Sequence, residues 1–119
     1  MKIMQSFLIF FYILDQGYSE CQEDDLGGFL GVISPELWAD GKPMDKSIFS
    51  DWVKISNPET VDAGNIIKRA YDFLEHYESA FGFNFSQAKQ WLLLSANKEI
   101  IEKAYDKAQI MYKKFCYDN

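Results

Sequence analysis

The string FLIFFYIL, residues 7–14, decides the fold of this chain. It belongs to a longer helical pattern over residues 3–16, whose strongest apolar stripe contains Ile3, Phe7, Phe10, Phe11 and Leu14. A helix that is apolar on most of its sides is typical of a central position, where several neighbours cover it. The glycine at position 17 then predicts the end of this helix.

The same stretch has some features of a signal peptide, because Lys2 precedes the apolar run. It lacks a small-residue cleavage site, however. Asp15-Gln16-Gly17 also interrupts it well short of the roughly 20 residues that span a bilayer. We therefore expect a buried helix in a cytoplasmic protein that does not associate with membranes.

Outward from this stretch, the first half of the chain carries signals of short helices and turns. Leucine, isoleucine and phenylalanine at helical spacing predict a short helix over residues 26–33. Ser34-Pro35-Glu36 is the start signal of another helical turn, and Asp40-Gly41-Lys42-Pro43 is typical of a turn. Asp45 can cap a third short helix that carries Trp52.

The second half carries signals of longer helices. Asn57-Pro58-Glu59 is expected to open a helix that Gly82 closes. Ser86 can start the next helix, and Asn97 can cap the last one, whose apolar stripe runs over residues 100–115.

No alternation of apolar and polar residues persists long enough to predict a strand. The hydrophobic content of 48% and the aromatic content of 17% are ample for a core and exclude intrinsic disorder. We expect an all-α fold: a compact bundle of about five to six helices in one domain spanning residues 1–119. Its acidic segment of short helices and turns lies near the N-terminus.

Charge is concentrated in that acidic segment. Residues 15–51 hold nine of the eighteen carboxylates against only Lys42 and Lys46, a local charge of −7 in a chain whose net charge is −6. Such a field repels phosphate backbones and anionic membranes and attracts basic surfaces. We therefore expect a protein partner with a basic surface, and no direct binding of nucleic acid.

The acidic segment also supplies the candidate contact residues. Carboxylates would speed the encounter with a cationic partner, and an aromatic ring among them would hold the complex. The predicted partner-binding residues are Glu20, Glu23, Asp24, Asp25, Glu36, Trp38, Asp40, Asp45 and Asp51. The alternative interpretation is that these acids only favour helix starts and keep the chain soluble.

Signals of catalysis are weak, so we expect no enzyme activity, no cofactor and no metal site. His76 is the single histidine and is expected at the surface. The acids around Asp40 lack the spacing of a calcium loop, and the glycines of residues 26–31 lack the context of a phosphate loop. Cys21 and Cys116 are either free thiols or a disulfide between the two ends of the chain.

Three strings in the acidic segment carry a resemblance to a known class of proteins. They are DDLGGFLG at residues 24–31, DGKPMD at 40–45, and Asp51-Trp52. This pattern resembles small acidic bacterial immunity proteins of contact-dependent growth inhibition and polymorphic-toxin systems. The resemblance implies that the chain binds a cognate toxin domain, such as a basic nuclease, and blocks its activity.

Two alternatives stay open beside the immunity function. The first is a self-associating structural or regulatory protein, whose excess aromatic residues pack against a second copy. The second is an enzyme that pairs His76 with a cysteine. Without its toxin, an immunity protein of this kind is expected to be a monomer or a weak homodimer.

Overall fold

The computed structural model describes residues 1–38, 41–43 and 45–115, and every regular element in these ranges is helical. This confirms the prediction of a compact all-α bundle of five to six helices. The elements are α1 Ile3–Cys21, α2 Asp24–Ile33, η1 Pro35–Leu37, α3 Lys46–Ser56, η2 Pro58–Thr60, α4 Ile66–Phe81, α5 Ser86–Leu94 and α6 Lys98–Lys114, where η marks a single 3-10 turn.

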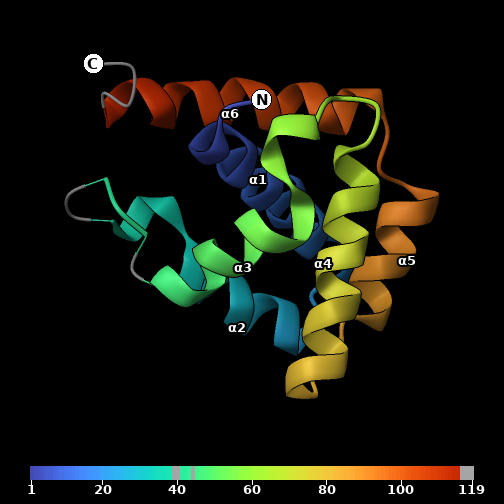
Figure 1. The fold of residues 1–119 in the computed structure, drawn as a ribbon. Helices are drawn as coiled ribbons and strands as arrows, with labels where there is room; N and C mark the ends of the chain where they lie inside the picture. Colours follow the sequence, from blue (N-terminus) through green and yellow to red (C-terminus); the bar gives the residue numbers. More distant parts are fainter. Residues whose placement is uncertain (39–40, 44, 116–119) are drawn as a thin grey trace.

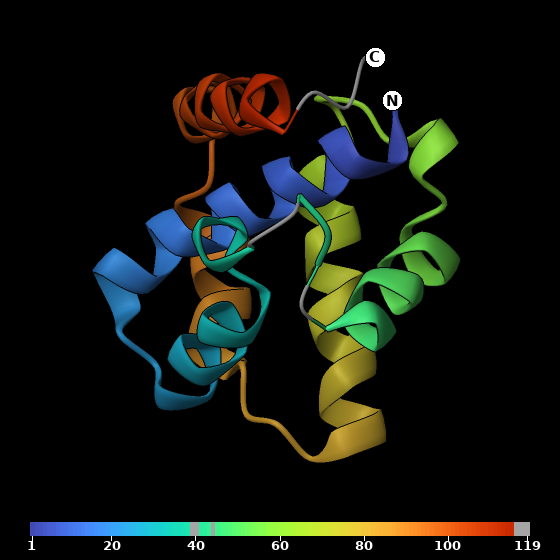
Figure 2. The same ribbon diagram turned by 90° about the vertical axis from the view of Figure 1, so that its left-hand side faces the viewer.

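Helix α1 is the centre of the bundle, as its apolar string predicts. All residues from Ser6 to Leu14 are buried. Helix α6 lies along one side of α1, and α2, α3 and α5 contact α1 from other sides (Figures 1 and 2). Helices α4 and α5 run side by side (Figure 1). A helix that is covered from several directions needs apolar residues around most of its circumference.

Aromatic rings fill the core beneath α1. The ring of Phe10 stacks on Trp52 of α3 with centroids 4.3 Å apart, and meets Phe73 of α4 edge-on at 5.1 Å. The indole N–H of Trp52 donates a 2.9 Å hydrogen bond to the buried hydroxyl of Ser6. Because this polar group is satisfied, the large ring can be buried completely.

The expectation that Gly17 ends the first helix is wrong. Helix α1 continues to Cys21 and ends at Gln22, whose φ of 50° is left-handed. Gly17 serves packing instead, because a Cβ atom there would lie 2.7 Å from Cε3 of Trp91 in α5. Although α1 is longer than predicted, no helix in the described ranges has both the length and the apolar character to cross a membrane.

The expected helix start at Asn57-Pro58-Glu59 is also wrong. These residues form only the turn η2, and α4 begins later, at Ile66. The backbone N–H groups of Gly64 and Asn65 bond to Oδ1 of Asp62, and the side chain of Asn65 accepts from the N–H of Asp62. These local hydrogen bonds hold residues 62–65 in a turn and so delay the helix.

Other boundary signals act as predicted. Asp45 accepts from the N–H of Ile48, and Asn97 accepts from the N–H of Ile100, so both side chains are N-caps. Gly82 ends α4 with a φ of 76°. Helix α5 begins at the expected Ser86.

Candidate partner-binding surface

Three carboxylates around the start of α5 are used inside the fold, and we call Glu23, Asp25 and Glu78 the inner carboxylates. Glu23 is only 7% exposed. It accepts hydrogen bonds from the N–H groups of Gln87 (3.0 Å) and Ala88 (3.1 Å). A carboxylate at this place satisfies N–H groups that have no partner within the helix and complements its positive end. The expectation that Glu23 lies on an open docking surface is therefore wrong.

The other two inner carboxylates hold the residues just before α5. Asp25 is half-buried and accepts from the N–H of Asn84 at 2.7 Å. Glu78 accepts from the N–H of Phe85 at 2.8 Å and forms a 2.5 Å ion pair with Lys89. Burial opposes the ionisation of Glu78, but its bonds to Lys89 and Phe85 outweigh burial and lower its pKa. Among the predicted contact residues, Asp25 thus has a structural role as well.

Asp45 and Asp51 also have intramolecular partners. Asp45 caps α3, and Asp51 accepts a 2.7 Å hydrogen bond from the hydroxyl of Tyr77. Burial, together with this bond to Asp51, raises the pKa of Tyr77 well above its ordinary value. Both acids are half-buried and lie against α3 and α4.

The aromatic anchor predicted at Trp38 is not on the surface. Its side chain is 5% exposed and lies between the rings of Phe7 and Phe115, with centroids 6.1 Å and 5.9 Å away. Its indole nitrogen has no hydrogen-bond partner among the described residues. Apolar stacking decided the place of this ring, so the expectation of an exposed anchor at Trp38 is wrong.

Three predicted contact residues do face solvent, and we call Glu20, Asp24 and Glu36 the outer carboxylates. They lie near the end of α1, at the start of α2 and in η1. None of them forms an ion pair with a lysine or arginine in the described part of the chain. The ninth predicted residue, Asp40, lies outside the described residues.

The elements that carry the outer carboxylates also expose apolar side chains. They belong to Tyr18 in α1, Val32 in α2 and Leu37 in η1, the last of which is 59% exposed. Burial raises the pKa of Asp15 in α1. The charge of Lys107 opposes this rise, and the charge of Glu36 adds to it. Helices α1 and α2 and the turn η1 thus carry exposed carboxylates without an ion-pair partner among the described residues, together with exposed apolar groups that a protein partner could cover.

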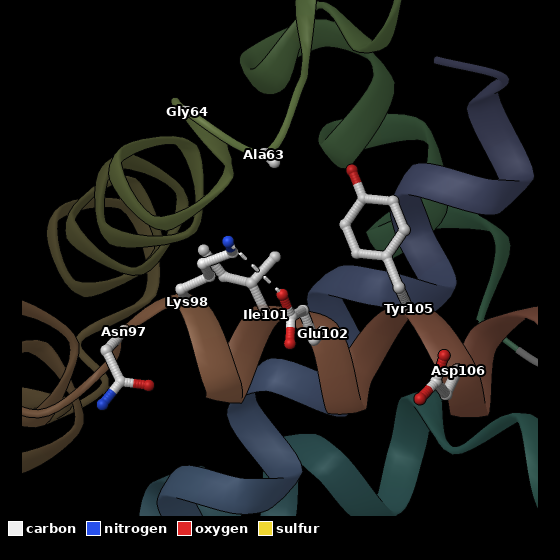
Figure 3. A pocket seen from close by; sticks show the side chains of 8 residues that line it. All are labelled: Ala63, Gly64, Asn97, Lys98, Ile101, Glu102, Tyr105 and Asp106. Atoms are coloured by element: carbon white, nitrogen blue, oxygen red, sulfur yellow. Dashed lines mark ion pairs between the residues drawn. The ribbon is translucent and has the colours of Figure 1, made fainter.

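A second candidate site is a groove of about 630 Å³ between α6 and the loop of residues 61–65 (Figure 3). Ala63 lies on the loop side, and Ile101 and the ring of Tyr105 project from α6 toward it (Figure 3). Burial, reinforced by the charge of Asp62, raises the pKa of the Tyr105 hydroxyl. That hydroxyl is therefore protonated at neutral pH and can donate a hydrogen bond.

Charged groups stand at the edge of this groove. Lys98 and Glu102 form an exposed ion pair of 3.9 Å, which Figure 3 marks with a dashed line. Asp106 is exposed and forms no ion pair within the described ranges. This groove could not be predicted from the sequence, because Ile101 belongs to the apolar stripe that α6 packs against the core. The other wall of the groove is formed by the loop of residues 61–65, which lies 36 or more positions before Ile101 in the chain.

Among the described residues, the histidine and cysteine side chains are not gathered in a site. His76 is exposed on α4, where its ring lies beside that of Tyr77 at 6.3 Å. Cys21 is a half-buried free thiol, and Cys116 lies outside the described residues. Within the described ranges no group of three or more His, Cys, Asp or Glu side chains could hold a metal ion.

No family model, characterised protein or solved structure matches this chain.

Proposed function

We propose that this chain is an immunity protein that binds and neutralises a basic toxin domain. The observation that carries the proposal is the set of exposed carboxylates on α1, α2 and η1. There Glu20, Asp24 and Glu36 are exposed without an ion-pair partner among the described residues, next to exposed apolar groups such as Leu37. The resemblance of residues 24–31 and 40–45 to immunity proteins of contact-dependent growth inhibition supports the same function.

The mechanism is electrostatic capture followed by exclusion of water. The outer carboxylates raise the rate of encounter with a cationic surface, and burial of apolar groups then slows dissociation. Leu37 takes the place of Trp38 as the proposed anchor, because it is exposed and the indole is not. A nuclease is a suitable target, because its substrate groove must be basic in order to bind phosphates. The complex would form in the cytoplasm, where such a toxin acts.

The test uses a toxin domain as the binding partner. This is the C-terminal domain of the secreted protein that we expect the neighbouring gene to encode. The variant Glu20→Lys/Asp24→Lys/Glu36→Lys should associate with it at least about tenfold more slowly at low salt. Added salt should slow the unmodified protein steeply and the variant only weakly. The matched control is Glu59→Lys/Glu75→Lys/Glu99→Lys, which changes net charge equally at exposed acids elsewhere. Equal rates for both triple variants would contradict the proposed surface.

Self-association is the second candidate, and exposed aliphatic side chains favour it. Leu93, Leu94 and Ile110 are 66%, 76% and 67% exposed. The tryptophans do not favour it, because Trp38, Trp52 and Trp91 are all buried in the core of the chain itself. Sedimentation of the purified protein distinguishes the candidates: a stable dimer that does not capture the neighbouring gene product supports self-association.

A further inference from the structure

We infer that the groove beside α6 is a docking site for a cationic, apolar segment of a partner protein. The inferred occupant presents an apolar side chain flanked by lysine or arginine. This inference rests on the proposed function only in taking the partner to be a basic protein. It adds a second contact region, which lies on α6 and the loop of residues 61–65, apart from the outer carboxylates.

The interior of the groove selects for an apolar side chain. Ile101 and Tyr105 are both only partly covered by the protein's own core, and Ala63 is exposed opposite them. A groove of about 630 Å³ lies within the range of volumes that bind small ligands and side chains. Insertion of a leucine or isoleucine there would remove apolar surface of both partners from water.

The charges around the groove select for a cation. The exposed carboxylates of Glu102 and Asp106 line the groove and that of Asp62 adjoins it, whereas Lys98 is the one cation among the described residues that line it. Lys98 lies 3.9 Å from Glu102 in an exposed ion pair, and Asp62 and Asp106 form no ion pair in the described ranges, so carboxylates outnumber cations at this edge. A lysine or arginine can lay its aliphatic stem along an apolar wall and place its charge near a carboxylate at the edge. An anionic segment would be repelled.

The loop side of the groove is already ordered. Asp62 accepts from the N–H groups of Gly64 and Asn65, and the Asn65 amide donates to the carbonyl of Thr60 at 2.9 Å. An occupant would therefore lose little free energy to ordering this loop. The Tyr105 hydroxyl projects from α6 toward the same side (Figure 3) and can donate to a backbone carbonyl of the occupant.

The test titrates the isotope-labelled full chain with a capped synthetic peptide of about 12 residues, or about three helical turns. The peptide has leucines three and four positions apart and lysines elsewhere, and one control peptide carries glutamate in place of every lysine. We expect the lysine peptide to shift the backbone amide resonances of Ala63, Gly64, Ile101 and Tyr105, with a dissociation constant of about 1 mM or tighter. The glutamate peptide should shift none of them. Shifts confined to α1, α2 and η1 would overturn the inference.

Two matched pairs of variants separate docking in the groove from general attraction to an acidic protein. Ala63→Phe fills the groove without a change in charge, and Ala80→Phe places the same ring at an exposed alanine of α4. The first should weaken peptide binding about tenfold and the second should leave it unchanged. Asp106→Lys should likewise weaken binding several times more than Glu20→Lys, although both change the net charge equally.

Equal effects within either pair would overturn the inference. Because Glu20 is an outer carboxylate, its variant also separates the two proposals. Loss of toxin binding in the triple variant of the outer carboxylates, together with no effect of Ala63→Phe on the peptide, would reject the groove and keep the proposed function. Binding of the peptide in the groove, without binding of the toxin domain, would keep the groove as a docking site and reject the proposed function.

Discussion

Glu23 and Asp24 are neighbours in the sequence, but they belong to two different regions of the structure. Glu23 is 7% exposed and caps α5, whereas Asp24 faces solvent at the start of α2. The same contrast separates the inner carboxylates from the outer carboxylates as sets. The fold explains the inner set through hydrogen bonds to residues 84–88, and it gives no such explanation for the outer set. The outer carboxylates are therefore the better candidates for a functional role, because hydrogen bonds within the fold do not explain them.

The largest expected effect comes from removal of the buried member of this pair. Glu23→Ala leaves two N–H groups of α5 without an acceptor, and it should lower the free energy of unfolding by about 2–4 kcal/mol. Asp24→Ala loses only a favourable charge in the first turn of α2 and should cost about 1 kcal/mol or less. Urea unfolding of both variants measures the difference. Equal losses would show that the two regions do not differ as described.

Gly17 and Gly28 show a similar contrast between a buried, closely packed position and an exposed one. A Cβ atom at Gly17 would lie 2.7 Å from the Trp91 ring, whereas one at Gly28 would meet no atom within 4 Å. Gly17→Ala should destabilise the fold by about 1–3 kcal/mol through overpacking between α1 and α5. Gly28→Ala should stabilise it by up to about 1 kcal/mol, because alanine favours a helix. Thermal unfolding distinguishes these opposite signs, and two shifts of the same sign would contradict this account.

Local signals predicted much of the fold. The helical pattern of residues 3–16, the caps Asp45 and Asn97 and the stop at Gly82 all depend on interactions within a few positions of the chain, and all are present. The prediction from Gly17 was wrong because this glycine makes room for the ring of Trp91, which lies 74 positions later in the sequence. A glycine that ends a helix and a glycine that admits a ring have the same appearance in a sequence.

The candidate site was less predictable, for a related reason. The excess of acids in residues 15–51 is visible in the sequence, but in the structure Glu23, Asp25, Asp45 and Asp51 bond within the fold, whereas Glu20, Asp24 and Glu36 face solvent. Whether an acid is exposed depends on which distant N–H groups approach it, as Gln87 and Ala88 approach Glu23. Trp38 is buried because Phe7 and Phe115 converge on it from the two ends of the chain. Only the folded structure shows which residues approach Glu23 and Trp38.

A smaller effect is expected in the pH dependence of stability, through the inner carboxylate Glu78. The pKa of Glu78 is lowered in the folded protein relative to its ordinary value of 4.5. Its ionised form therefore stabilises the fold, fully above the unfolded-state pKa and progressively less as the pH falls through the folded-state pKa. The partner Lys89 agrees in direction, because its bond to Glu78 raises the pKa of the ammonium group.

Glu78→Gln tests this dependence. At neutral pH the variant should be less stable than the unmodified protein, and the difference should shrink as the pH falls below 4.5. Unfolding in urea at a series of pH values measures it. Asp72→Asn is the control, because its exposed ion pair with Lys68 contributes little at any pH. A difference that stays constant with pH would show that Glu78 acts through packing and not through its charge.

The smallest expected effect concerns the outer carboxylate Glu36 and its neighbour Asp15. Burial raises the pKa of Asp15, Lys107 opposes this, and the charge of Glu36 adds to it. Glu36→Gln should therefore lower the pKa of Asp15 while it changes the free energy of unfolding by less than about 0.5 kcal/mol. A carboxyl-detected NMR titration of Asp15 measures the shift, and Glu20→Gln should leave it unchanged, because Glu20 is not among the charges that shift Asp15. If both variants alter Asp15 equally, the outer carboxylates act as one continuous field, and a partner would sense their sum. If only Glu36→Gln acts, they are separate charges, and a partner must contact each of them.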